Sequence, residues 1–174
     1  SLRGNNVYSN GYLGINLAGG VEDFSGVTVN DPGDPDTGPN NLQNYPVLTQ
    51  AAGSGASTII SGTLNGTPGR TMLVDVYRSS FADASGYGEG QNYIGSTLTT
   101  TSGGGSAAFT LTAASNLAGQ YITATATDQT TGDTSEFSLA LLATNGPAIP
   151  TFTSPVTLTS TGFNAHISLA IGQN

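Results

Sequence analysis

The sequence contains no cysteine and no tryptophan among its 174 residues. The absence of cysteine excludes disulfide bonds, catalytic thiolates and cysteine-ligated zinc sites. Without a tryptophan and a cysteine pair, an antibody-type immunoglobulin domain is excluded too. Whatever stabilises the chain must therefore be non-covalent packing or a metal held by oxygen ligands.

Positive charge is almost absent as well. There is no lysine, only three arginines face eleven acidic residues, and the net charge is −8. Nucleic-acid binding needs a basic surface that releases counterions, so we expect no nucleic-acid partner. No apolar run approaches the about 20 residues of a membrane span, so we expect no membrane insertion. The chain does not begin with Met, and we expect a mature or excised piece of a longer, secreted protein.

The residues that are plentiful are Gly, Ser, Thr and Asn, which disfavour long helices and suit short strands joined by turns. Between residues 45 and 144 the turn signals "NGTPGR", "TSGGGS" and "DQTTGD" separate segments that alternate apolar and polar positions. Seven such segments over about 100 residues predict an all-β, Ig-like seven-strand β-sandwich. The predicted strands are residues 45–52, 57–66, 71–80, 93–101, 106–114, 120–128 and 134–144.

The two ends of the chain follow different patterns. Residues 1–29 place short apolar pieces between Asn and Gly, which is typical of a rung of a parallel β-helix. Residues 145–174 begin with a proline-containing linker and continue with the cleanest two-residue alternation in the chain, from Phe163 to Ile171. We therefore expect a rung-like N-terminal cap before the sandwich, and an extra C-terminal strand or hairpin after it.

The segment 30–44 is the expected joint between cap and sandwich, and it begins "NDPGDPDTGPNN". Calcium takes six to eight oxygen ligands, and carboxylates and amides that alternate in a bent loop can supply them. The loop lacks the twelve-residue frame of an EF-hand. The plainer alternative is a linker made of turn-forming residues. The predicted calcium ligands are Asn30, Asp31, Asp34, Asp36 and Asn40.

A second acidic group, Asp128, Asp133 and Glu136, flanks the turn "DQTTGD". It is either a weaker cation site or a set of solvated turn charges, and we favour the solvated charges.

Catalytic chemistry is not expected. The sole histidine, His166, lies on the polar side of the terminal strand, and no G-x-S-x-G motif accompanies it. Carbohydrate binding is the stronger rival, because Phe81, Tyr87 and Tyr93 lie in or beside a glycine-rich loop at 80–92. The alternative is that these rings cap the sandwich core.

Several stretches together resemble the C-terminal part of secreted bacterial right-handed parallel β-helix repeat proteins. They are "GNNVYSNGYLGINL", "VNDPGDPDTGPNNLQNYPVL", "SGTLNGTPGRTMLVDVYRS", "GEGQNYIGS" and "GQYITATATDQTTGDTSEFS". In that family the last rungs run into an acidic N-D-x-x-D-x-D-x-G-x-N-x-L-Q-N-x-P joint and then an Ig-like sandwich. The resemblance covers roughly residues 3 to 140. It departs from the family at Asn16, where an Asp often follows "GI".

The resemblance implies an extracellular location on the bacterial cell surface and an adhesive or structural role, with no known reaction. From it and the residues we expect a non-enzymatic module, stabilised by calcium. The rung and the terminal strand are two unfinished ends, which favour a homo-oligomer or a filament. A glycan or another cell-surface ligand is a further expected partner. The alternative function is a carbohydrate-binding module attached to a β-helix protein that acts on polysaccharides.

Overall fold

Eight strands and one short 3-10 helix make up the regular structure of residues 1–146, the part of the chain that the computed structural model describes. The 3-10 helix η1 precedes the first strand, and the last two strands are only two residues long. The elements are η1 (Pro39–Leu42), β1 (Val47–Ser54), β2 (Ser57–Asn65), β3 (Thr71–Ser79), β4 (Asn92–Thr100), β5 (Ser106–Ala113), β6 (Tyr121–Asp128), β7 (Leu141–Leu142) and β8 (Thr144–Asn145).

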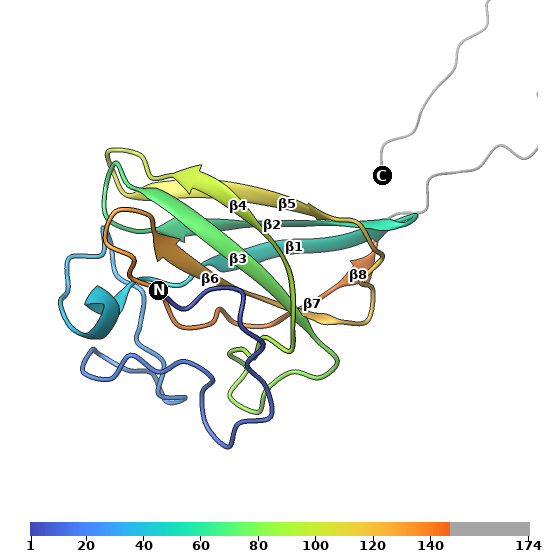
Figure 1. The fold of residues 1–174 in the computed structure, drawn as a ribbon, viewed down its shortest axis with the longest axis horizontal. Coiled ribbons are helices and arrows are strands. Elements are labelled where there is room, and N and C mark those ends of the chain that lie inside the picture. Colours follow the sequence, from blue (N-terminus) through green and yellow to red (C-terminus); the bar gives the residue numbers. More distant parts are fainter. Residues whose placement is uncertain (147–174) are drawn as a thin grey trace, which may run out of the picture.

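The strands form two four-stranded sheets, in the orders β5-β2-β1-β8 and β4-β3-β6-β7. Figure 1 shows the two sheets as the layers of a sandwich. All pairings are antiparallel except that of β1 with β8. The all-β sandwich prediction is thus confirmed, and six of the predicted strands are present with ends within two residues of those expected. The Gly- and Asn-containing turns explain this accuracy, because they end each strand locally.

The seventh predicted strand, 134–144, is present only in fragments. Beside β6, the hydroxyls of Ser135 and Ser138 accept hydrogen bonds from the backbone N–H groups of Ala126 and Ala124. A serine side chain that competes for backbone donors interrupts a regular ladder. The chain then pairs with β6 through β7 and with β1 through β8, so it passes from one sheet to the other.

The main core lies between the sheets and follows from the alternation of each strand. Val74 and Val76 of β3 and Ile122 and Ala124 of β6 face Ile60 and its neighbours in the other sheet, all fully or almost fully buried. Burial of this apolar surface is the dominant favourable term in folding. The other members of the cluster are Ala51, Phe109, Ala113, Leu117 and Ala143.

The outer face of the two central strands, β3 and β6, is also buried, which alternation alone does not predict. Asp75, Tyr77 and Thr123 alternate with the core residues and yet are at most 2% exposed. Residues 1–29 cover them: the backbone N–H of Gly4 donates to the hydroxyl of Tyr77, and Val7 forms a β-bridge with Gly90. Figure 1 shows this segment in blue along one side of the sandwich.

Within residues 1–29 the structure contains isolated bridges but no strand. Val7 pairs with Gly90 and Glu22 pairs with Thr28, both antiparallel. The rung interpretation is therefore not confirmed. The predicted linker and terminal strand, with His166, belong to residues 147–174 and lie outside the described residues.

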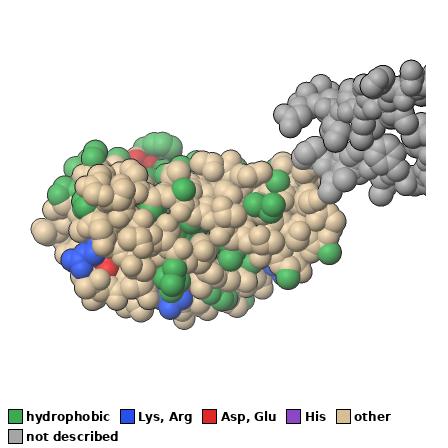
Figure 2. Space-filling view, turned by 90° about the horizontal axis from the view of Figure 1, so that it is seen from above, with side chains coloured by type: hydrophobic (Ala, Val, Ile, Leu, Met, Phe, Trp, Pro, Cys, Tyr) green, Lys and Arg blue, Asp and Glu red, His purple; other side chains and the backbone are tan. Residues whose placement is uncertain are grey.

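The surface reflects the composition. The face drawn in Figure 2 carries few charged side chains, and its hydrophobic side chains are scattered among uncharged ones and backbone. No helix in residues 1–146 is long and apolar enough to cross a membrane.

Candidate metal centre

The acidic joint turns sharply just before β1, with several residues in left-handed backbone conformations. Gly33 has a φ of 81° and Asp34 one of 56°, and Asn40 and Asn41 follow at 47° and 48°. Gly, Asn and Asp adopt this region more readily than other residues do. The Gly, Asn and Asp residues that are typical of turns therefore also allow this segment to fold back on itself.

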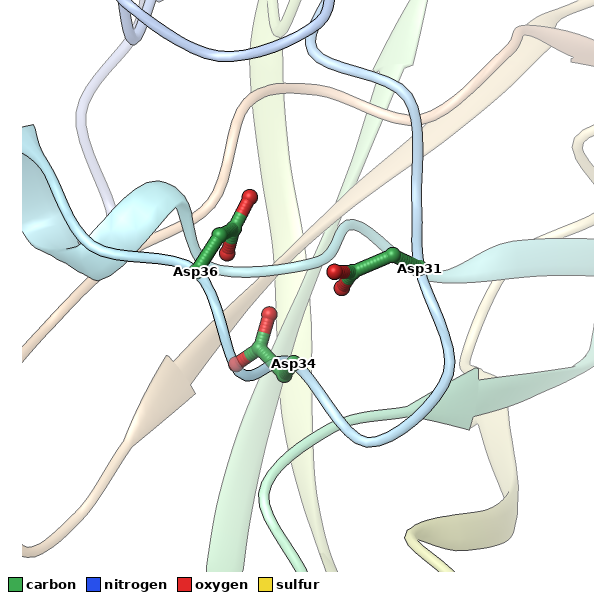
Figure 3. A group of neighbouring side chains, drawn as sticks. All are labelled: Asp31, Asp34 and Asp36. Carbon is green, nitrogen blue, oxygen red and sulfur yellow. The ribbon is translucent and has the colours of Figure 1, made fainter.

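This bend brings the three predicted aspartates together. One carboxylate oxygen from each of Asp31, Asp34 and Asp36 lies within 4.8 Å of the other two. Figure 3 shows the three carboxylates pointing toward a common centre from one loop. It is the only group of three or more acidic or histidine side chains in residues 1–146 with such a geometry.

The centre is electrostatically unfavourable for three negative charges. The pKa of Asp34 is raised from 3.8 to about 6, first by burial and then by the charges of Asp36 and Asp31, although a hydrogen bond from Asn44 opposes the shift. Burial also raises the pKa of Asp36, and the charge of Asp31 adds to it. Carboxylates at this separation cannot all ionise without cost unless a cation balances them.

Two oxygen atoms at the centre have no hydrogen-bond partner within the described residues. They are Oδ1 of Asp31 and Oδ1 of Asp36, and both atoms are buried. A buried carboxylate oxygen without a donor loses its hydration and gains nothing in return. Such atoms fit a divalent cation as the missing partner, because carboxylate oxygens are ligands that calcium prefers.

A neighbouring asparagine, Asn44, fixes the loop. Its side chain accepts a hydrogen bond from the N–H of Asp31 at 3.0 Å and donates one to the carbonyl of Asp31 at 2.7 Å. Its own backbone N–H donates to Oδ1 of Asp34 at 2.8 Å. Asn44 was not among the predicted site residues. The signal for it was weak, because an Asn in a turn-rich stretch usually serves only the turn.

The two predicted asparagine ligands have other partners. The side chain of Asn30 exchanges hydrogen bonds with the backbone N–H and carbonyl of Tyr45, at 2.9 and 2.8 Å. Oδ1 of Asn40 accepts from the N–H of Thr134 at 3.0 Å. Both asparagines therefore tie the joint to the sandwich, and three of the five predicted ligands converge.

The second acidic group does not come together. Asp128 accepts a hydrogen bond from the N–H of Thr130 in its own turn, and Asp133 accepts one from the side chain of Asn41. Glu136 points elsewhere, toward the N-terminal segment. These three carboxylates act separately, each with its own partner. Asp128 is 4% exposed and Glu136 is 2% exposed, so the favoured interpretation of solvated turn charges is wrong for both.

Glu136 holds both ends of one N-terminal loop. Its Oε1 accepts from the N–H of Leu17 and its Oε2 from the N–H of Thr28, each at 2.8 Å. The side chain is 2% exposed, and burial raises its pKa. Sequence reasoning missed this role because the two partners are more than 100 residues away.

Asp75 and Glu89 attach the N-terminal segment at two points closer to its beginning. Asp75 forms a two-point ion pair with Arg3, with distances of 3.0 and 3.1 Å. Glu89 accepts a hydrogen bond of 2.6 Å from the side chain of Asn10. Asp75, Glu89 and Glu136 are all buried, and the fold tolerates them because each acid has hydrogen-bond partners.

The aromatic residues singled out for carbohydrate binding do not form one cluster. Tyr87 packs edge-on against Tyr45 at 5.5 Å between ring centres, and Tyr93 packs against Tyr77 at 5.6 Å. Phe81 is 83% exposed. Two of the three rings thus have partners within the chain, although Tyr93 is still 41% exposed, and Phe81 is the most exposed of the three.

Comparison with protein-family models and with curated proteins gives no match to this chain. The geometry of the joint is therefore the observation from which a function is argued.

Proposed function

We propose that the chain is a calcium-stabilised, non-enzymatic structural or adhesion module of a secreted bacterial surface protein. In this proposal a calcium ion binds Asp31, Asp34 and Asp36. The ion offsets most of the negative charge of the joint and helps to fix the N-terminal segment 1–29 to the sandwich.

One observation carries the proposal: three carboxylates converge within 4.8 Å, and two of their buried oxygens lack a donor. A plain linker, the alternative interpretation, gives no reason for this convergence, because solvated turn acids relieve their repulsion by pointing apart. The joint is moreover fixed by Asn44 and by the pairing of Asn30 with Tyr45. A fixed set of oxygens reduces the cost of ordering the ligands when an ion binds.

The choice of calcium follows from the ligand type. All three side chains are carboxylates, which suit hard cations, and there is no cysteine in the chain to favour a softer metal. Calcium tolerates irregular geometry and fills its shell with carbonyls and water. Magnesium requires a near-ideal octahedron and is the competitor to be tested.

The test is calorimetric titration of the intact, chelator-treated protein with calcium and with magnesium, together with thermal unfolding. We expect one calcium site per chain. A ligand at 100 times its dissociation constant stabilises by about 2.7 kcal/mol, and the melting temperature should rise by about 5–10 °C.

The variants Asp31→Asn, Asp34→Asn and Asp36→Asn should each weaken or abolish calcium binding. Glu22→Gln is the control, because it removes one negative charge from an exposed residue away from the joint. Equal calcium responses in all four variants, or no heat of binding in the wild type, would refute the calcium proposal.

The Ig-like description of the sandwich also belongs to this proposal. The first two strands lie in one sheet, the third and fourth in the other, and β5 and β6 return to the first and second sheet respectively. This exchange between sheets supports an Ig-like arrangement, with the fragments β7 and β8 in place of a seventh strand. A last β-helix rung at residues 1–29 rests on the family resemblance.

Assembly through chain ends completes the proposal. β1 pairs with β8 only at Ala52 and Gly53, so within the described part of the chain the outer edge of residues 47–51 has no ladder partner. An unpaired edge accepts a further strand. A strand from a second copy would extend this sheet and produce an oligomer or a filament.

A further inference from the structure

Two cavities lie side by side where the N-terminal segment meets the loop between β3 and β4. The first has a volume of about 200 Å³ and the second of about 370 Å³, and Asp83 lines both. We call this pair of cavities the loop groove. It lies among residues 8–26 and 79–91, and none of its lining residues belongs to the acidic trio.

Exposed aromatic rings lie along the groove. Tyr8 and Phe81 line the first cavity and are 53% and 83% exposed, and Tyr12 lines the second and is 91% exposed. Large aromatic side chains usually bury their faces in a core or an interface. Three rings presented beside hollows therefore offer flat apolar surfaces to a ligand.

Polar groups with unused hydrogen-bonding capacity face the same space. Glu89 is 7% exposed and lines the first cavity, yet the only contact of its Oε2 is a long one of 3.4 Å to the N–H of Asn10. Oε1 of Gln91 accepts from the N–H of Ser80, which leaves its NH₂ group to donate. Asp83 is held through Oδ1 by Ser85, which leaves Oδ2 to accept.

The walls of the groove are held in place before any ligand arrives. Val7 and Gly90 exchange two backbone hydrogen bonds of 2.8 and 2.9 Å, and Asn10 is bound to Glu89. Ser79 donates to the carbonyl of Glu89 and accepts from the N–H of Gln91. Because the backbone on both sides of the groove is already fixed, binding need not pay for ordering it.

We propose that the loop groove binds a neutral oligosaccharide. Sugar rings stack their apolar faces on aromatic side chains, and their hydroxyls both donate and accept hydrogen bonds. The groove supplies both complements: Asp83 and Glu89 accept, whereas the amides of Gln91 and Asn16 donate. Acidic sugars are disfavoured because two carboxylates and no basic side chain line the groove.

A cationic ligand is the main competitor, since carboxylates and aromatic faces also attract ammonium groups. The lining favours the sugar. Oε1 of Glu89 already accepts a hydrogen bond from Asn10. The amide NH₂ groups of Gln91 and Asn16 are donors, and they cannot form a hydrogen bond to a cation. The two adjoining cavities, each beside an exposed ring, correspond to at least two neighbouring sugar units.

The test uses the intact chain in calcium buffer on an array of cellopentaose, chitopentaose, xylopentaose, mannopentaose and pentagalacturonate, with oligolysine as a cationic probe. The best binder is then titrated by calorimetry. We expect a neutral oligosaccharide to bind, and Tyr8→Ala and Phe81→Ala each to weaken binding about 5- to 10-fold. Because Phe81 is 83% exposed, Phe81→Ala should leave the melting temperature unchanged, whereas Tyr8 is only 53% exposed and Tyr8→Ala removes some packing as well.

Leu98→Ala is the matched control, since Leu98 is an exposed apolar residue of β4 outside the groove and its loss should leave affinity unchanged. The proposal is overturned if no neutral oligosaccharide binds, if oligolysine or pentagalacturonate binds better, or if the Tyr8 and Phe81 variants bind as the control does. Asp34→Asn, which removes a proposed metal ligand, should retain sugar binding. The sugar-binding proposal and the calcium proposal can therefore be refuted independently of each other.

Discussion

At the scale of single residues, the acids of this protein divide by their partners. Asp75 has an arginine, Glu89 has an asparagine side chain, and Glu136 has two backbone N–H groups. The joint has only the N–H of Asn44 for Asp34, and two neighbouring oxygens have no donor. A carboxylate without compensation in a buried position favours its protonated form, unless a cation arrives.

This imbalance gives a pH dependence to the metal-free protein. The folded-state pKa of Asp34 is about 6, above its ordinary value of 3.8, so the folded protein holds this proton more tightly than the unfolded chain. The resulting stability is fully present below about pH 4 and is lost as the pH rises through 6, by at most about 3 kcal/mol. Urea unfolding in chelator between pH 4 and 7 should therefore show a larger fall for the wild type than for Asp34→Asn.

With calcium present the trend should reverse. The ion needs the ionised carboxylate, so the stabilisation by calcium should increase as the pH rises through 6. In chelator, the opposite result is also informative. If the free energy of unfolding falls equally with pH in the wild type and in Asp34→Asn, the raised pKa assigned to Asp34 is wrong.

At the scale of elements, the N-terminal segment 1–29 behaves as a cover for a sheet face rather than as a strand. Leu17 and Val27 are 3% and 1% exposed, and the chain around them is attached by hydrogen bonds to the side chain of Glu136, in the segment between β6 and β7. Glu136 is central to this attachment because it binds the loop at both Leu17 and Thr28. The segment forms few backbone hydrogen bonds to neighbouring strands, so hydrogen bonds to buried acids hold it in place instead.

Glu136→Gln tests this attachment. The amide keeps one acceptor but directs an NH₂ group toward a backbone N–H, so one buried donor loses its partner. We expect a loss of about 1–3 kcal/mol in the free energy of unfolding. Hydrogen exchange at Leu17 and Thr28 should accelerate more than at Ile122 in the core. Glu22→Gln removes a nearby exposed charge but leaves both hydrogen bonds of Glu136 in place, so it should not accelerate exchange at Leu17 and Thr28. Equal protection in both variants would argue against the role of Glu136.

Much of the element level was predictable. Six strands were located because each is bounded by Gly, Asn or Asp turns that act over a few residues. The broken course of 134–144 was not, since Ser135 and Ser138 alternate as strand residues do and their bonding to Ala126 and Ala124 depends on the fold. At the candidate site the three aspartates were predictable from their spacing, whereas the bracing by Asn44 was not.

At the scale of the whole molecule, the joint is the covalent connection between segment 1–29 and the sandwich, beside the attachments made by Asp75, Glu89 and Glu136. The joint carries the acidic trio, and it is tied to the sandwich by Asn30 with Tyr45 and by Asn40 with Thr134. Offsetting its negative charge with calcium should stiffen the connection between segment 1–29 and the sheets. Any assembly that uses both the N-terminal segment and a sheet edge then depends on that connection.

Electron microscopy of the intact protein tests this dependence. In calcium we expect regular fibres or ordered oligomers, and in chelator we expect these to dissociate. A variant with Asp34→Asn and Asp36→Asn should resemble the chelated wild type even when calcium is present. Monodisperse single chains under all of these conditions, checked by light scattering at increasing concentration, would contradict assembly.

The sequence by itself determined the all-β class, the turns, most strand limits and the acidic spacing of the joint, because each depends on neighbours only a few residues apart. Only the tertiary structure decided which acids receive hydrogen-bond partners and which acids lie beside one another. Asp75, Glu89 and Glu136 acquire partners from the first 28 residues of the chain, whereas Asp31, Asp34 and Asp36 acquire chiefly one another. The reason is physical: the cost of a buried charge depends on what the fold brings within hydrogen-bonding distance, and a local pattern does not contain that information.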